Sequence, residues 1–314
     1  MKQTVSIILS THNRADCLPQ TLACLAAAEV PRGMEAELIV VDNGSTDATG
    51  DVLASCRIPH LNLRVLCEPR PGKARACNDG LSAARGEILF FTDDDVHVPC
   101  NWLTAMCAPI LRHEAHAVSG AVRLPPHLLL PWMDEFHRGW LGSSEGFREN
   151  DVHNMLGGNM AFSREVLERV PGFDPDLGPG MLGCHEESLF TWQLQRAGFR
   201  VRFLPNVVAE HHFPTSRLTR GAMLATAERA GISSGYLAHH WEHRRIHNAH
   251  YRWTRARARL AYRRLRRFGL RVPADRSPRW EMEMVMDVAY YKQYLNERER
   301  PRHYERYGLR RLDA

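Results

Sequence analysis

The first ninety-five residues of the chain alternate between short apolar runs and longer segments with a helical pattern. Four apolar runs rich in β-branched residues are separated by three helical patterns: 5–9 (VSIIL), 37–42 (ELIVVD), 62–66 (NLRVL) and 87–91 (EILFF), with helices near 16–28, 46–56 and 74–84. Alternation at this spacing predicts βαβ units with right-handed crossovers. We therefore expect an α/β fold with a Rossmann-like, mostly parallel sheet flanked by helices.

After residue 95 the alternation loosens. The pattern predicts a helix over 101–112, a strand near 117–122, a helix that begins near Glu186 and ends at Gly198, and a strand over 200–204 (RVRFL). From Arg217 onward the chain looks mostly helical. We predict two parts, a catalytic domain over 1–216 and a helical, basic extension over 217–314.

The two predicted parts differ in charge. The extension carries 23 basic against 10 acidic side chains, whereas residues 1–216 carry 18 basic against 26 acidic side chains. An acidic body with a basic tail suggests that the two parts meet different partners.

The cysteines and the hydropathy of the sequence indicate the cellular compartment of the protein. The eight cysteines form no CxxC pair and no zinc spacing, which indicates reduced, structural thiols and a cytoplasmic protein. The apolar core at the N-terminus is only five residues long, too short for a signal peptide, and no apolar stretch is long enough to span a membrane.

Three of the predicted strands end in polar clusters: 10–14 (STHNR), 42–47 (DNGSTD) and 93–95 (DDD). Ligands of parallel α/β sheets bind beyond the carboxyl ends of the strands, so these clusters are expected to gather along one rim. For 42–47 alone, a turn whose Ser45 or Thr46 caps the next helix explains the composition equally well.

The triplet Asp93-Asp94-Asp95 ends an apolar strand on that rim. In extended backbone Asp93 and Asp95 share a face and Asp94 points away. Two carboxylates on one face suit Mn²⁺ or Mg²⁺, which would also hold substrate phosphates. The alternative is that the triplet caps the helix after Pro99 or forms a solvated turn.

A second carboxylate pair, Glu186 and Glu187, lies at the start of a predicted helix. Acidic residues are common in a first helical turn because the helix dipole favours them there. The functional alternative is a general base for an acceptor hydroxyl.

The order of motifs resembles glycosyltransferase family 2, the inverting enzymes of the GT-A (nucleotide-diphospho-sugar transferase) fold. The resemblance rests on VSIILSTHNR, LIVVDNGSTD, PGKARACNDGL, GEILFFTDDD, GGNMAFSR with GFD, and a Glu-Glu helix ending in RAGFRVRFLP and VVAEHH. These motifs extend over roughly residues 3–213.

The resemblance implies roles for individual residues. On the donor side, Asp42 is similar to a carboxylate that binds a uracil-type base edge, Asp93 and Asp95 match the two acids of the DxD motif, and His211, with His212 as a rival, is similar to a histidine that completes the metal site. Asn159, preceded by Gly158, resembles a segment that touches the transferred sugar on the acceptor side. The further positions expected to bind the nucleotide sugar are Thr11, Asn13, Arg14, Gly72, Arg75, Asn78 and Asp94.

One position departs from the family pattern. The family usually has Glu-Asp where this chain has Glu186-Glu187, so Glu187 stands at the position of the catalytic base and Glu186 stays a candidate. The implied activity is metal-assisted transfer, with inversion, from a nucleotide-diphosphate sugar to a glycan or glycolipid acceptor. The alternative is a nucleotide-sugar-binding protein of the same fold without activity.

Two other functions fit the sequence poorly. An oxidoreductase would need the glycine fingerprint of a dinucleotide site, and STHNRADC after the first strand lacks it. A nucleotidyltransferase would need a glycine-rich activating loop there.

The Arg-rich segment 252–271 places Trp253, Leu260, Leu265 and Phe268 near helical spacing. Such a helix could lie peripherally on an anionic membrane at its cytoplasmic face, or its apolar stripe could pack on the acidic catalytic domain. No nucleic-acid-reading motif accompanies the arginines, so we expect no nucleic-acid partner.

Overall fold

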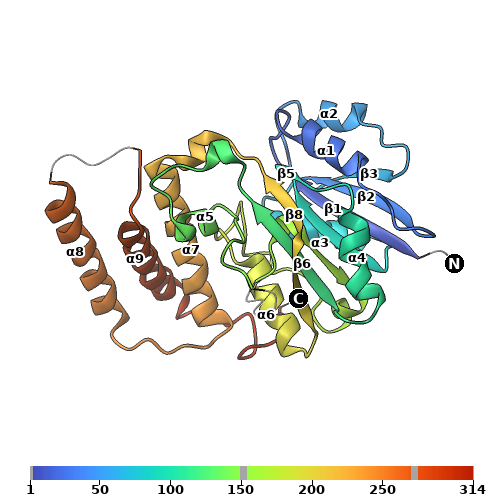
Figure 1. Ribbon diagram of the computed structural model, residues 1–314. Coiled ribbons are helices and arrows are strands. Elements are labelled where there is room, and N and C mark those ends of the chain that lie inside the picture. The colour runs from blue at the N-terminus through green and yellow to red at the C-terminus, as the bar shows by residue number, and fades with distance from the viewer. Residues whose placement is uncertain (1–2, 149–153, 270–274, 314) are drawn as a thin grey trace.

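The computed structural model of the protein describes residues 3–148, 154–269 and 275–313 (Figure 1). Within these ranges the chain forms one eight-stranded sheet with helices on both faces. The strands are β1 (Thr4–Thr11), β2 (Glu35–Asp42), β3 (Asn62–Cys67), β4 (Ile88–Asp93), β5 (Val96–His97), β6 (Ala117–Arg123), β7 (Met160–Ser163) and β8 (Val201–His211).

The sheet has the order β3-β2-β1-β4-β7-β6-β8-β5 and is mostly parallel, as predicted. Strands β3, β2, β1 and β4 are parallel neighbours, as are β6 and β8, whereas β7 and β5 run antiparallel to their neighbours. Because β1 lies between β2 and β4, Thr11 pairs with Asp42 and Ser10 pairs with Asp93. The polar ends of these strands therefore meet at one edge of the sheet.

Helices cover the two faces of the sheet in layers. On one face lie α1 (Leu18–Ala26), α2 (Thr49–Ser55) and α4 (Trp102–Leu111), and on the other lie α3 (Lys73–Ala83) and α6 (Glu186–Arg196). The alternation of strand side chains decides which face each residue enters: Ile7 and Leu9 pack in the first layer and Ile8 in the second.

Short helical turns connect the later strands. These are η1 (Pro126–Leu128), α5 (Glu135–Trp140), η2 (Gly157–Asn159), η3 (Arg164–Glu168) and η4 (Thr215–Leu218). The strand predicted over 200–204 continues to His211 and shifts its register against β6 between Gly120 and Ala121. This longer β8 carries His211 to the rim at which β4 ends.

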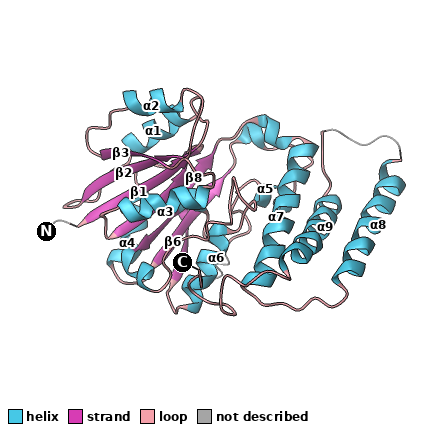
Figure 2. Cartoon of the chain, turned by 180° about the vertical axis from the view of Figure 1, so that it is seen from behind, coloured by secondary structure: helices cyan, strands magenta, loops and turns pink. Residues whose placement is uncertain are grey.

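The C-terminal part is helical, with α7 (Arg220–His240), α8 (Ala249–Phe268) and α9 (Arg279–Glu297). Its core is shared with the rest of the chain, because Met223 and Ala227 of α7 join a cluster with Leu124 and Leu128. A second shared cluster joins residues near α6 to the C-terminal part: Leu177 and Leu189 with Tyr236, Leu237, Trp241 and Tyr304. Helix α7 lies next to the sheet-containing part, α9 beside it, and α8 at the far end of the molecule (Figures 1 and 2).

The predicted basic segment 252–271 falls mostly in α8, while its last two residues lie outside the described residues. Trp253, Leu260 and Phe268 are at least partly buried, as the apolar stripe predicts, but Leu265 is 64% exposed. No helix in the described ranges is long and apolar enough to span a bilayer.

Candidate active site

A pocket of about 380 Å³ opens at the carboxyl ends of β1 and β4. The loop after β1, the start of α3, the turn after β4 and the end of β8 all contribute to its wall. It brings together seven of the residues predicted from the sequence: Thr11, Arg14, Gly72, Asp93, Asp94, Asp95 and His211. Residues far apart in the sequence thus converge where the strand pattern placed the site.

The three aspartates all line this pocket, which differs from the expectation that Asp94 points away. The reason is that β4 ends at Asp93 and the chain turns at Asp94 and Asp95, so the two-residue alternation of a strand does not continue. Arg14 lies between the last two carboxylates, with its Nε 3.3 Å from Asp94 Oδ1 and its Nη2 3.6 Å from Asp95 Oδ2.

Burial and neighbouring charges give Asp94 and Asp95 different pKa values. Burial, followed by the charge of Asp95, raises the pKa of Asp94 to about 7. Burial also opposes the charge on Asp95, but a hydrogen bond and charge from His211, with Arg14 and Arg217, lower the pKa of Asp95 to about 2. Of these two acids, Asp95 is therefore the one whose ionised form the pocket favours.

His211 is oriented toward Asp95. Its Nδ1 donates a hydrogen bond to the Leu141 carbonyl at 2.8 Å, which leaves Nε2 without a proton when the ring is neutral, 3.3 Å from Asp95 Oδ1. The next residue, His212, points to the other side of the strand, where its ring stacks on His97 and contacts Glu210. Of the two histidines proposed from the sequence, only His211 lines the pocket.

Lys73, the first residue of α3, connects the aspartates to the glutamate pair. Its Nζ lies 2.7 Å from Asp93 Oδ1, 3.3 Å from Glu187 Oε1 and 3.9 Å from Glu186 Oε1. Burial opposes its charge, but Asp93, Glu187 and Glu186 together raise the pKa of Lys73 well above its usual value. Lys73 lines the pocket, whereas the two glutamates lie just beyond its wall.

The two glutamates have different surroundings. Glu186 is buried, its Oε2 has no hydrogen-bond partner, and its pKa is raised well above the usual value by burial and then by the charge of Glu187. The side chain of Glu187 is 21% exposed and lies over Gly157, where an added Cβ would be 2.1 Å from Oε1. Only Glu187 thus presents an accessible carboxylate.

The GGN turn η2 packs against both carboxylate groups. A Cβ on Gly158 would lie 3.3 Å from Asp93 Oδ2, so the two glycines leave room for Asp93 and Glu187. Asn159 is fully buried instead. Its side chain accepts a hydrogen bond from the Trp102 indole and donates to the carbonyls of Ala121 and Val207. The structure does not bring the Asn159 side chain to the pocket.

Four other predicted donor residues lie outside the pocket wall: Asn13, Asp42, Arg75 and Asn78. Asn13 Oδ1 accepts hydrogen bonds from the backbone of Thr46 and Asp47, and Asp42 Oδ1 accepts one from the Ser45 backbone. These contacts are those expected of a structured turn, the alternative interpretation of 42–47.

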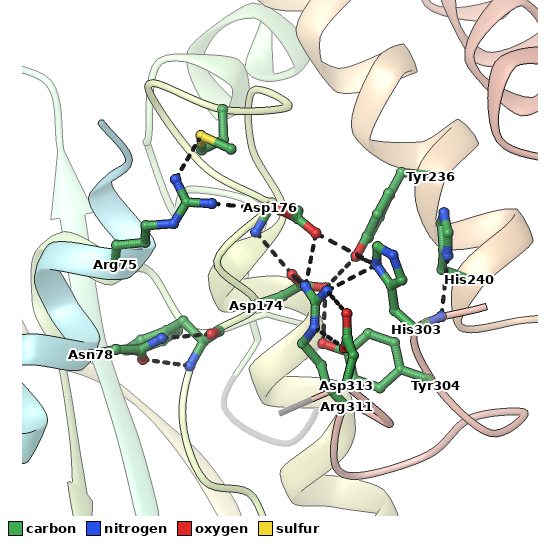
Figure 3. A network of polar contacts seen from close by, with 12 residues as sticks. Arg75, Asn78, Asp174, Asp176, Tyr236, His240, His303, Tyr304, Arg311 and Asp313 are labelled. Carbon is green, nitrogen blue, oxygen red and sulfur yellow. Dashed lines mark hydrogen bonds and ion pairs between the residues drawn. The ribbon is translucent and has the colours of Figure 1, made fainter. Parts of the chain in front are cut away.

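Arg75 and Asn78 belong to a network that joins α3 to the C-terminal segment (Figure 3). Asn78 exchanges two hydrogen bonds with the Phe173 backbone, and Arg75 lies 3.7 Å from Asp176. Asp174 accepts hydrogen bonds from the hydroxyls of two tyrosines and pairs with an arginine, namely Tyr236, Tyr304 and Arg311. The loop that follows carries Pro179 and Gly180 into the pocket wall, and the Lys73 backbone donates to the Pro179 carbonyl.

Two basic residues of the pocket wall, Lys73 and Arg217, are among those that the sequence-based prediction missed. Lys73 lies inside the quoted motif PGKARACNDGL, so its place between Gly72 and Arg75 was an available signal. Arg217 contacts His211 at 3.4 Å and Asp95 at 3.9 Å, although the predicted boundary assigns it to the extension. No local pattern in the sequence indicates that contact.

The pocket offers a small set of ligands for a cation. Within the described ranges no three or more His, Cys, Asp or Glu side chains are grouped as a metal site. Asp95 and His211 are a pair of oxygen and nitrogen ligands, and Asp93 lies in the same pocket. A cation here would need further ligands from a substrate.

The chain matches the model of glycosyl transferase family 2 over residues 6–170. It is 32% identical to glycosyltransferase AglE of Haloferax volcanii over 211 residues, which are 66% of each chain. It is 26% identical to the succinoglycan biosynthesis protein ExoM of Rhizobium meliloti over 238 residues, which are 74% of each chain. The match to the probable glycosyltransferase YdaM of Bacillus subtilis, at 22% identity, covers 67% of this chain and 51% of YdaM.

Solved structures share the fold. The mannosyltransferase PcManGT from Pyrobaculum calidifontis, in complex with GDP-Man and Mn²⁺, aligns with a TM-score of 0.57 and 24% identity, covering 95% of this chain and 71% of that chain. S. aureus TarS in complex with UDP-GlcNAc aligns with a TM-score of 0.51 and 18% identity, covering 97% and 93%. The predicted GT-A fold is thereby confirmed.

Proposed function

The chain belongs to glycosyl transferase family 2, and we propose on this basis that it transfers a sugar from a nucleotide-diphosphate sugar to a hydroxyl of a glycan or lipid-linked acceptor. The observation that carries the proposal is the arrangement around Lys73. This side chain contacts Asp93, which lines the pocket proposed for the donor, and Glu187, the proposed base. One ion-pair network therefore joins the donor pocket to the proposed base.

The pocket suits the diphosphate of such a donor. Arg14, Lys73 and Arg217 supply positive charge around it, and Gly72 forms part of its wall. Asp95 and His211, with Asp93 beside them, would hold a Mn²⁺ or Mg²⁺ ion, which when bound neutralises the charge that develops on the departing diphosphate. The fit rests on the Leu141 hydrogen bond, which places the proton of a neutral His211 ring on Nδ1, so that the lone pair of Nε2, which now lies beside Asp95 and Arg217, would be the ligand.

Glu187 is the proposed general base. Its partly exposed carboxylate would take the proton of the acceptor hydroxyl as that oxygen attacks the anomeric carbon. The new bond forms on the face opposite the departing nucleoside diphosphate, and the configuration inverts. Glu186 is the weaker candidate because its carboxyl is buried, and burial and then the charge of Glu187 raise its pKa and so disfavour its ionised form.

Relatives support the proposal at the level of substrate class. AglE is named a glycosyltransferase and ExoM a succinoglycan biosynthesis protein, while PcManGT and TarS were solved with GDP-Man and UDP-GlcNAc. We therefore propose a nucleotide-diphosphate sugar as donor and a step of glycan assembly as the reaction. All eight cysteines are free thiols, which fits our proposal of a cytoplasmic place of work.

A nucleotide-sugar-binding protein without transferase activity is the second candidate. The observation that favours it is the pairing of Glu187 with Lys73, since a carboxylate held by an ammonium group must leave that partner before it can reach an acceptor hydroxyl. Both candidates bind nucleotide, but only the first forms a product.

Thermal unfolding with UDP, GDP, dTDP or CDP, each with and without Mn²⁺ or Mg²⁺, tests the donor site. A ligand that binds only the native state must raise its stability, by about 2.7 kcal/mol at a hundredfold excess over Kd. We expect one nucleotide to raise Tm only when the metal is present, and Asp95→Asn to lose most of that shift. Folded protein that responds to no nucleotide would contradict the transferase and the binding protein alike.

A further inference from the structure

Helix α8 carries a strong positive charge at the edge of the molecule. Its twenty residues include eight arginines and no acidic side chain. It is the outermost helix, beyond α9 and α7 when viewed from either side (Figures 1 and 2). Apart from its contact with α9, most of its surface is therefore free.

The contact between α8 and α9 uses one narrow stripe of the helix. Ala249 and Leu260 are the buried residues of α8, and Phe268 packs on Trp280. Glu281 of α9, fully buried, accepts one hydrogen bond from Arg264 of α8 and others from Arg220 of α7. The ion pair with Arg264 attaches α8 to α9, and it involves only one of the eight arginines of α8.

The other arginines of α8 face solvent or a groove between α8 and α9. The groove has a volume of about 1120 Å³, and six of the eight arginines line it, with Asp287 as its one acidic residue. These six are Arg252, Arg255, Arg259, Arg263, Arg266 and Arg267. In the part of the chain that the structure describes, none of them has a carboxylate within 4.0 Å. Their charge is thus available to a partner.

Opposite the packed stripe, α8 presents large apolar side chains. Tyr251 and Tyr262 are each 63% exposed and Leu265 is 64% exposed, and the two tyrosines also line the groove beside the arginines. At 100° per residue, these three positions lie on the side of the helix away from Leu260. A helix with arginines flanking exposed tyrosines and a leucine matches the composition of helices that lie in a membrane interface.

We propose that α8 docks this face on the surface of an anionic phospholipid bilayer. The arginines would contact lipid phosphates while Tyr251, Tyr262 and Leu265 enter the boundary of the acyl chains. Charge complementarity selects this occupant, since the α8 of a second copy would repel it. The exposed leucine favours a bilayer over nucleic acid, which offers no apolar layer to receive it.

Co-sedimentation of the full chain with vesicles tests this surface. Phosphatidylcholine vesicles with and without phosphatidylglycerol are compared for the wild type and for Arg255→Gln/Arg259→Gln/Arg266→Gln. Each arginine near an anionic surface is worth about fivefold in binding, so the triple variant should lose about a hundredfold. Arg32→Gln/Arg57→Gln/Arg85→Gln removes the same charge from exposed positions elsewhere and should bind as the wild type does.

A second variant and two further outcomes complete the test. Tyr262→Ser/Leu265→Ser should weaken binding to anionic vesicles even at low salt, because it removes the apolar contact. Equal vesicle binding by the α8 triple variant and the wild type would overturn the proposal. So would a wild type that binds a nucleic-acid duplex but no anionic vesicle at the same ionic strength. Vesicle binding requires no transfer activity. The result therefore tests the docking of α8 independently of the proposed reaction.

Discussion

At the scale of single residues, the different surroundings of Glu186 and Glu187 predict different mutational effects. Glu187→Gln should lower the rate of sugar transfer by about two to four powers of ten, because the amide cannot take a proton. Nucleotide binding should change little, since Glu187 lies beyond the pocket wall. Glu186→Gln keeps the neutral form that burial favours and should retain most of the activity. Steady-state kinetics together with nucleotide titration would measure both effects, and the reverse ranking would make Glu186 the base.

Glu186 also predicts how stability depends on pH. An unfolded glutamate has a pKa near 4.3, and burial raises the pKa of Glu186 well above that value in the fold. Between these two values the native state holds a proton that the unfolded state has released, so stability falls as pH rises. Glu186→Gln removes this dependence, by up to about 1.4 kcal/mol per pH unit.

Urea unfolding at pH 5 to 8 measures this difference. The Glu186→Gln and wild-type curves should coincide at the acidic end and separate with rising pH, the variant becoming the more stable. Glu299→Gln, at an 80% exposed side chain, is the matched control and should follow the wild type. Parallel curves for Glu186→Gln and the wild type would show that Glu186 is ionised in the native state.

At the scale of elements, the sequence was most informative where a pattern is local. The apolar runs of β1, β2 and β4, the helical patterns between the strands and the polar residues after them predicted both the parallel sheet and the rim of the pocket. Asp94 was misplaced because a pattern cannot tell at which residue a strand gives way to a turn. Arg217 was missed because its contact with Asp95 depends on the path of η4 after β8, and tertiary packing sets that path.

The C-terminal extension shows the same limit of what the sequence predicts. Its helical and basic character followed from composition, and the sequence left open whether it packs on the body or meets a membrane. In the structure α7 and α9 pack against each other, and α7 also packs on the sheet-containing part, while α8 leaves most of its arginines exposed. The two interpretations therefore apply to different helices of one extension.

At the scale of the whole molecule, the C-terminal segment closes back on the loop beside the pocket through Arg311. Its Nη1 lies 2.7 Å from Asp174 and 2.9 Å from Asp176, and the Asp174 side chain is completely buried (Figure 3). Removing one partner of a buried ion pair leaves an uncompensated charge in the interior. The last residues of the chain thus stabilise a segment that begins more than a hundred positions earlier and reaches the pocket at Pro179.

Arg311→Met should therefore lower the free energy of unfolding by about 3–5 kcal/mol. Asp174→Asn in the same chain should restore part of that loss, because it removes the unpaired charge while an amide oxygen can still accept from the hydroxyls of Tyr236 and Tyr304. Arg302→Met, at an exposed position of the same segment, should cost little. Urea unfolding of the four variants forms a double-mutant cycle with its control. If the losses of Arg311→Met and Asp174→Asn simply add, the pair is not coupled, and the C-terminal segment is held by its apolar contacts alone.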